Sequence, residues 1–187
     1  MTHRLEDVIA LFDGLFQPTY HTCLIRGGEE PLYLPADETT PFHRVIFAHG
    51  FYASALHEIS HWCIAGARRR QWEDYGYWYL PDGRDPAEQQ DFEGVEVAPQ
   101  ALELLFSRAC DLPFNVSVDN LGGEVEVDRD AFRARVETRA ARYQRDGLPA
   151  RAAALERALQ AFYHQGADLE QAVAAGRALL STPSMPA

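Results

Sequence analysis

The sequence predicts an α+β protein in which a central helix packs on a small sheet and helices form the C-terminal third. Short apolar runs of strand length lie in the N-terminal half, around one apolar stretch of helical length. After residue 128 the chain becomes rich in Ala, Arg and Glu, which favour helix. A length of 187 residues is typical of one domain, 1–187. Within it we expect an α+β core at 4–125, a helical part at 128–180 and a flexible tail at 181–187.

The first elements follow from spacing. Apolar residues recur every three or four positions over 4–16 and predict a helix, with Pro18 following its end. Strand-length runs at 22–26, 32–34 and 44–48 are bounded by Gly, Pro or Asp. We expect these runs to form the small sheet.

The central helix is expected over 51–65. It is apolar nearly all round, which is typical of a buried helix. It also carries two histidines and a glutamate in the pattern H-E-x-x-H: His57, Glu58 and His61. Buried polar groups are costly unless they find partners, and a metal ion is the simplest partner for this set.

Beyond the central helix, an aromatic run at 75–80 predicts a strand. A second helix is expected over 99–110, because Pro99 suits a first helical turn. Three further helices are expected in the C-terminal part, at 128–145, 148–165 and 168–180.

The composition of the chain limits the kinds of molecule that it can be expected to bind. Lys+Arg 17 against Asp+Glu 28 gives a net charge of −11, which disfavours direct binding to nucleic acid and suits a cationic substrate or a basic partner. No run approaches the roughly 18 apolar residues of a membrane span. The N-terminus resembles no signal peptide, and three widely spaced cysteines form no disulfide framework. A cytoplasmic location without membrane attachment is the expectation.

The H-E-x-x-H pattern predicts a metal site. Residues four apart lie on one face of a helix, so His57 and His61 can bind a single ion. Glu58 can then contact a metal-bound water without binding the metal. We therefore expect a zincin-like metal-binding helix packed on the sheet.

A third ligand is needed, because such catalytic sites use three protein ligands and keep a position open. No histidine follows His61 until His164, so a carboxylate is expected. Glu96 is favoured, because it lies at the entry to the second helix between Val95 and Val97, which would bury the backbone and aim the carboxylate inward. Glu93 and Glu103 are the alternatives. Glu93 lies in a more polar run and could instead make supporting contacts, and Glu103 fits only if the two helices pack directly.

The same ligands serve two chemistries. With zinc, the site would be that of a metallopeptidase or amidase with Glu58 as general base. With Fe(II), a two-histidine, one-carboxylate site is typical of oxygenases. Spacing alone leaves both open. His49, just before the helix, is expected to be a structural residue, with a supporting or substrate-contacting role as the alternative.

A resemblance to a known family favours the Fe(II) oxygenase over the zinc hydrolase. Several runs are similar to the elongation factor P hydroxylase family, at residues 33–37, 47–66, 76–79, 81–85, 95–97, 99–102, 113–117 and 119–121. The resemblance covers about residues 5–165. It implies a non-haem Fe(II) hydroxylase that uses O2 and acts on elongation factor P carrying a lysyl-modified lysine. His57 and His61 match the family's metal-binding positions, whereas Glu96 as third ligand is inferred from spacing.

Such a substrate carries two positive charges. Acidic and aromatic side chains are suited to receive it, and four candidates follow the central helix: Tyr77, Trp78, Asp82 and Asp85.

Overall fold

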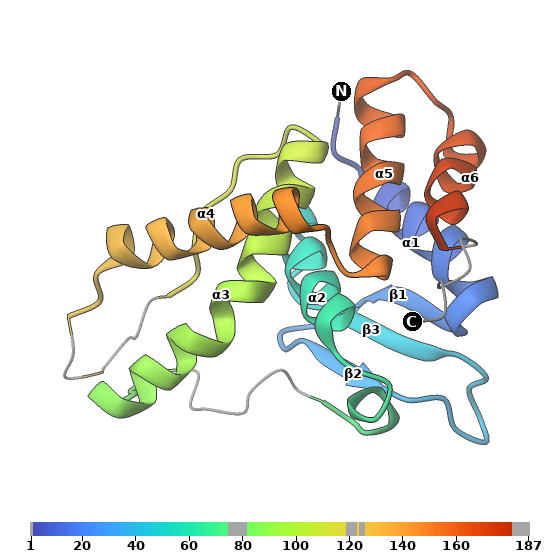
Figure 1. Cartoon of the computed structure of the whole chain (residues 1–187). Coiled ribbons are helices and arrows are strands. Elements are labelled where there is room, and N and C mark those ends of the chain that lie inside the picture. The colour runs from blue at the N-terminus through green and yellow to red at the C-terminus, as the bar shows by residue number, and fades with distance from the viewer. Residues whose placement is uncertain (1, 75–81, 119–122, 124–125, 181–187) are drawn as a thin grey trace, which may run out of the picture.

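The computed structural model describes residues 2–74, 82–118, 123 and 126–180 (Figure 1). Within them the chain is α+β, as predicted. The helices are α1 (Leu5–Tyr20), α2 (Tyr52–Ile64), α3 (Pro86–Ala109), α4 (Arg129–Asp146), α5 (Ala150–His164) and α6 (Leu169–Leu180), with a short 3-10 turn at Arg69–Gln71. The strands are β1 (Thr22–Arg26), β2 (Leu32–Leu34) and β3 (His43–Phe47). None of these helices is long and apolar enough to span a bilayer.

The sheet has the order β1-β3-β2, so β3 is the central strand. β1 runs parallel to β3, with Leu24 opposite Val45, and β2 runs antiparallel to it, with Tyr33 opposite Val45. Val45 and Phe47 alternate with less buried neighbours along β3. Their buried face joins the core that α2 also enters, so the sheet supports the central helix.

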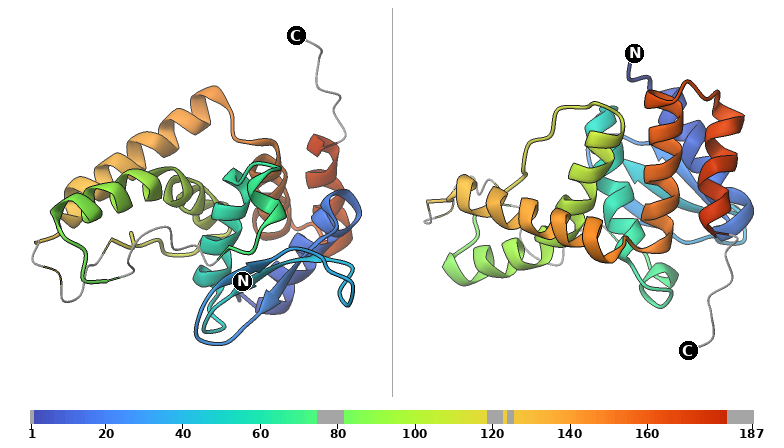
Figure 2. Two further views of the ribbon diagram at one scale, coloured as in Figure 1. Left: turned by 90° about the horizontal axis from the view of Figure 1, so that it is seen from below. Right: turned by 45° about the horizontal axis from the view of Figure 1, so that its top comes forward.

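The main core joins α1, β1, β3, α2, α5 and α6 with the C-terminal half of α3. A second cluster lies between α3, α4 and the segment around Val116 and Val118. Figures 1 and 2 show α3 and α4 crossing each other and extending away from the side where α1, α5 and α6 pack together. The central helix α2 lies between these two groups and contacts both.

The predicted end of α1 at residue 16 is wrong, because the helix continues through Pro18 to Tyr20. A proline inside a helix leaves the carbonyl four residues earlier without its usual donor. Here that carbonyl belongs to Gly14, and Arg177 of α6 donates to it from Nε at 2.9 Å and Nη2 at 2.6 Å. A side chain more than 150 positions away in the sequence thus supplies the missing bond.

The predicted start of the second helix at Pro99 is also wrong. α3 begins at Pro86, and Pro99 lies in its interior. Asp85 and Glu88 form a capping box at the true start, where each side chain accepts from the backbone N–H of the other residue. Pro86 occupies the first turn, the position that the sequence argument gave to Pro99.

The other predicted helices agree with the structure to within two residues, as do the strands at 22–26, 32–34 and 44–48. The strand predicted at 75–80 and the tail at 181–187 lie outside the described residues. The division of the chain at residue 125 stays a prediction.

Arg151 of α5 holds the C-terminal end of the central helix. Its Nη1 donates to the Trp62 carbonyl at 2.6 Å and its Nη2 to the Ala65 carbonyl at 2.7 Å. The last carbonyls of a helix have no partner within it, and a cation there also complements the helix dipole. The guanidinium lies over the Trp62 ring as well, 4.6 Å from its centroid.

We expect Arg151→Met to lower the free energy of unfolding by about 2–3 kcal/mol, because the Trp62 carbonyl loses its charged donor and the Ala65 carbonyl keeps only that of Arg70. For a chain of this length that corresponds to a fall of roughly 5–10 °C in the melting temperature. Thermal unfolding followed by circular dichroism measures it. Arg157→Met on the same helix is the control, since Arg157 bonds only the exposed Gln165 side chain among the described contacts. Equal melting temperatures for the two variants would refute the capping role.

Candidate metal centre

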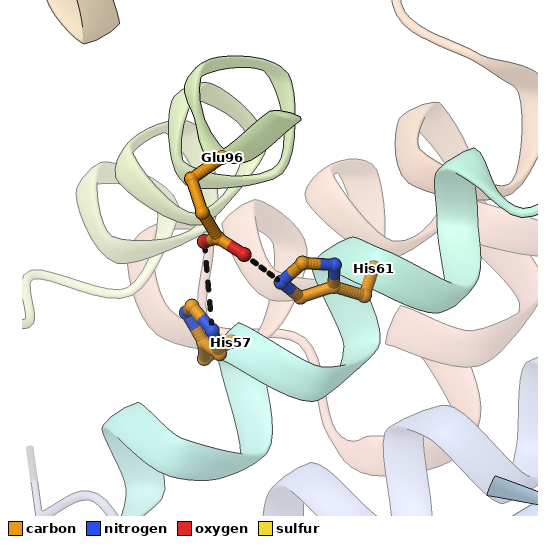
Figure 3. A group of neighbouring side chains, drawn as sticks. All are labelled: His57, His61 and Glu96. Atoms are coloured by element: carbon orange, nitrogen blue, oxygen red, sulfur yellow. Dashed lines mark ion pairs between the residues drawn. The ribbon is translucent and has the colours of Figure 1, made fainter. Parts of the chain in front are cut away.

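Three side chains from two helices meet beside the central helix. His57 and His61 project from one face of α2, and Glu96 reaches them from α3 (Figure 3). Glu96 Oε1 lies 3.1 Å from His61 Nε2, and its Oε2 lies 3.9 Å from His57 Nε2. Within the described residues this is the one group of three potential ligands whose donor atoms all lie within 4.8 Å of one another.

The separations fit one ion. Ligand atoms about 2.1 Å from a metal, at right angles or tetrahedral angles, lie about 3.0–3.4 Å apart. The 3.1 Å pair already has this spacing. The 3.9 Å distance ends on the other carboxylate oxygen, and the three ligand atoms, one from each residue, lie within 4.8 Å of one another. Two imidazole nitrogens and a carboxylate oxygen are a donor set that zinc and Fe(II) both accept. The residues therefore fit a divalent metal ion.

Glu96 lies in the middle of α3, so the predicted position at the start of that helix is wrong. Its flanking valines do not bury it as expected, because Val95 is 49% exposed. The direct packing of α3 on α2 turns the carboxylate inward, and the Glu96 side chain is 4% exposed. The two histidines are 17% and 24% exposed, so the group opens to solvent on the histidine side.

Glu103 lies two turns further along the same face of α3. Its Oε2 is 2.8 Å from His57 Nδ1, at the far side of the imidazole from Glu96. A carboxylate on the second nitrogen fixes the orientation and tautomer of a ligating histidine. Glu103 was expected near the site only if the two helices pack directly, and α2 and α3 do pack directly. The contact that Glu103 makes there is with His57 Nδ1.

Glu93, the other predicted candidate, lies one turn before Glu96. It is half-buried and does not belong to the group of three.

Glu58 faces a small cavity between α2 and the sheet. The cavity has a volume of about 40 Å³, and its walls include Tyr33, His61, Trp62 and Asp74. Burial raises the pKa of Glu58, the two histidines oppose that shift, and Glu96 and Glu103 add to it. A carboxyl group that keeps its proton nearer to neutral pH can exchange protons with a reacting group at the cavity wall.

The carboxylates also act on His57. Burial lowers the pKa of this imidazole, but Glu103, followed by Glu58 and Glu96, outweighs burial and raises the pKa to about 10. In the metal-free protein His57 therefore holds a proton at neutral pH. A metal ion has to displace that proton in order to bind.

Metal affinity should consequently rise with pH. Below a pKa of about 10 His57 is protonated, so displacement of one proton gives up to about tenfold tighter apparent binding per pH unit. Competition titrations with a chelator at about pH 6, 7 and 8 measure the slope. Glu103→Gln removes the strongest partner of the imidazolium, so its slope should be shallower. A wild-type affinity that does not change over this range would show that no proton is displaced.

The remaining predicted residues lie elsewhere or have other contacts. His49 is exposed, in a left-handed conformation with φ 61°, and its N–H donates to the Gly28 carbonyl at 2.9 Å. Asp85 caps α3, and Asp82 is exposed. Tyr77 and Trp78 lie outside the described residues.

The sequence of α3 carries one further signal for the position of Glu96 and Glu103. Polar residues recur at alternating steps of four and three: Gln89, Glu93, Glu96, Gln100, Glu103 and Ser107. All but Glu93 are buried. A buried polar stripe at helical spacing indicates a helix face turned toward a charged site, and it would have placed Glu96 and Glu103 on one helix.

A two-histidine, one-carboxylate group on packed helices of an α+β chain defines a candidate metalloenzyme. Residues 11–173 match the model of the family described as "Elongation factor P hydroxylase". A relative, the "Elongation factor P lysine hydroxylase" of Haemophilus influenzae, is 48% identical over 172 residues, which are 92% of this chain and 96% of the relative. The chain belongs to the elongation factor P hydroxylase family. The resemblance seen in the sequence is thereby confirmed, and the chain is an enzyme of the hydroxylase class.

Proposed function

We propose that this enzyme hydroxylates the lysyl-modified lysine of elongation factor P, with Fe(II) held by His57, His61 and Glu96 and O2 as co-substrate. The observation that carries the proposal is the ligand group itself, which lies in a member of a hydroxylase family. Two histidines and one carboxylate with open positions are the donor set of non-haem Fe(II) oxygenases. Bound Fe(II) would supply the activation of oxygen. One oxygen atom would enter a C–H bond of the modified lysine, and the other would leave as water after taking up two protons and two electrons from an added reductant.

The chain's own residues prepare the site for that chemistry. Glu103 holds the His57 ring with Nε2 toward Glu96. The buried carboxylates of Glu96 and Glu103 gather negative charge beside the two histidines, which favours a divalent cation. The partial exposure of both histidines leaves a side from which a substrate can approach.

Glu58 is proposed to move a proton during the reaction. It follows His57 directly, and it lines the cavity together with His61. Its raised pKa suits a group that both accepts and returns a proton near neutral pH.

The proposed substrate is doubly cationic, and the net charge of −11 favours its approach. Asp82, Asp85, Tyr77 and Trp78 remain proposed contacts for it, and so does His49. We further propose that the central helix packs on the sheet in a zincin-like arrangement and that the protein is located in the cytoplasm.

The test loads the metal-free protein with Fe(II) or with zinc and offers elongation factor P with and without the lysyl group. We expect the iron form alone to add one oxygen atom to the modified lysine, detected by mass spectrometry of the peptide that carries it. Unmodified elongation factor P should react poorly, since it lacks the second positive charge. If the zinc form cleaved peptide or amide bonds while the iron form left elongation factor P unchanged, the hydrolase alternative would replace this proposal.

A further inference from the structure

Gln100 of α3 contacts both Glu96 and a segment without secondary structure that crosses the helix. The side chain is fully buried, one turn beyond Glu96. Its Nε2 donates to Glu96 Oε2 at 3.1 Å and to the Ser117 carbonyl at 2.8 Å. Its Oε1 accepts from the Ser117 backbone N–H at 2.9 Å. Both amide hydrogens and the amide oxygen of Gln100 therefore have partners.

These contacts fix which end of the amide faces the carboxylate. A backbone N–H and a carbonyl of one residue present one donor and one acceptor, so they accept the Gln100 amide in one orientation only. Turning the amide over would set its oxygen against both the Ser117 carbonyl and the Glu96 carboxylate. Ser117 therefore dictates that Gln100 presents an N–H to Glu96.

The segment that sets this orientation is itself held by helix side chains. Arg129 Nη2 donates to the Val116 carbonyl at 2.9 Å, and Gln89 Nε2 donates to the Val118 carbonyl at 3.2 Å. Val116 and Val118 are buried in the cluster between α3 and α4. The backbone of Ser117 is thus anchored on both sides, and it gives Gln100 a firm support.

We propose that Gln100 is a positioning residue for the metal site, which holds the Glu96 carboxylate through its Oε2 and leaves Oε1 turned toward His61. Glu103 does the same for His57, so one face of α3 carries a proposed ligand and two residues that orient ligands. Such supporting hydrogen bonds typically change metal affinity by about 10- to 100-fold. The inference rests on the metal-site part of the proposed function and not on the substrate or the reaction.

Cobalt(II) binding tests the role, because the visible absorption of Co(II) reports ligand geometry and the titration gives the dissociation constant. The variants are Gln100→Met, which removes the amide at similar length, and Gln100→Asn, which keeps the amide but shortens its reach. We expect each to raise the dissociation constant about 10- to 100-fold and to shift the absorption bands. Gln100→Asn keeps a polar, soluble side chain in case Gln100→Met does not fold.

The matched control is Gln89→Met. Gln89 is another buried glutamine of α3 that bonds the same segment, at Val118, with no described contact to Glu96. It should lose stability but change cobalt affinity and the cobalt spectrum less than either Gln100 variant does, because Arg129 still holds the segment at Val116 and the Gln100 amide still reaches Glu96. Wild-type cobalt binding in both Gln100 variants, or an equal change in Gln89→Met, would overturn the role. If Glu96→Gln also bound Co(II) as the wild-type protein does, both the assignment of Glu96 as a ligand and the positioning role of Gln100 would be wrong.

Discussion

Replacing Glu96 by Gln should deprive the protein of its metal and of its activity. The amide is a neutral and weaker ligand than the carboxylate, so only His57 and His61 would remain as strong donors. We expect the dissociation constant for Fe(II) or Co(II) to rise by at least about a hundredfold, more than the loss of a supporting hydrogen bond would cause. Metal content after gel filtration and hydroxylation of modified elongation factor P measure the two effects.

Glu93→Gln is the matched control for that change. Glu93 lies one turn earlier on α3 and is half-buried, but it does not belong to the group of three. The variant should keep its metal and most of its activity. The assignment of the third ligand would be wrong if Glu96→Gln kept its metal while Glu93→Gln or Glu103→Gln lost it.

Replacing Glu58 by Gln should separate catalysis from metal binding. The side chain keeps its size but can no longer exchange a proton, and loss of such a group typically costs about 10²–10⁴-fold in rate. Metal content should stay near that of the wild-type protein, because Glu58 is not one of the three proposed ligands. Single-turnover hydroxylation by the metal-loaded variant measures the loss.

Glu156→Gln provides the comparison for Glu58. Glu156 on α5 is also a partly buried carboxyl group, whose pKa is raised by burial, and it lies in a different cavity beside Arg108 and His164. Its replacement should leave the rate unchanged. A Glu58→Gln protein that turned over at the wild-type rate would remove the proton-transfer role.

The central helix and its two histidines could be predicted from the sequence, because both signals are local. Apolar positions all round 51–65 indicated burial, and the four-residue spacing placed His57 and His61 on one face. Glu96 could be reached by elimination, since no nearby histidine was available. The reason given for its orientation was nevertheless wrong, because the packing of α3 on α2 turns it inward and Val95 is half exposed.

Both errors in the helix bounds arose at a proline whose usual effect is overridden by another feature of the chain. Pro18 usually ends a helix, but Arg177 supplies the donor that Gly14 would otherwise lack, and α1 continues. Pro99 suits a helix start, but the helix already begins at Pro86, after the capping box at Asp85 and Glu88. In each case a second signal outweighed the proline.

The supporting roles of Gln100 and Arg151 could not be predicted from the sequence, because both depend on contacts with distant segments. Gln100 acquires its role from Ser117, and Arg151 acquires its role from the carbonyls of Trp62 and Ala65. Neither pairing follows from spacing along the chain, since it requires knowing which segments cross. The alternating polar stripe on α3 is the part of this arrangement that the sequence does contain.

The most direct test of the proposed function is the origin of the oxygen atom in the product. Metal-free protein is loaded with Fe(II), mixed anaerobically with a chemical reductant and with elongation factor P carrying the lysyl-modified lysine, and then exposed to oxygen gas enriched in the heavy isotope. We predict that the modified lysine gains one heavy oxygen atom and that no hydroxylation occurs while oxygen is excluded. Hydroxylation under complete exclusion of oxygen would contradict the iron-oxygenase mechanism at His57, His61 and Glu96.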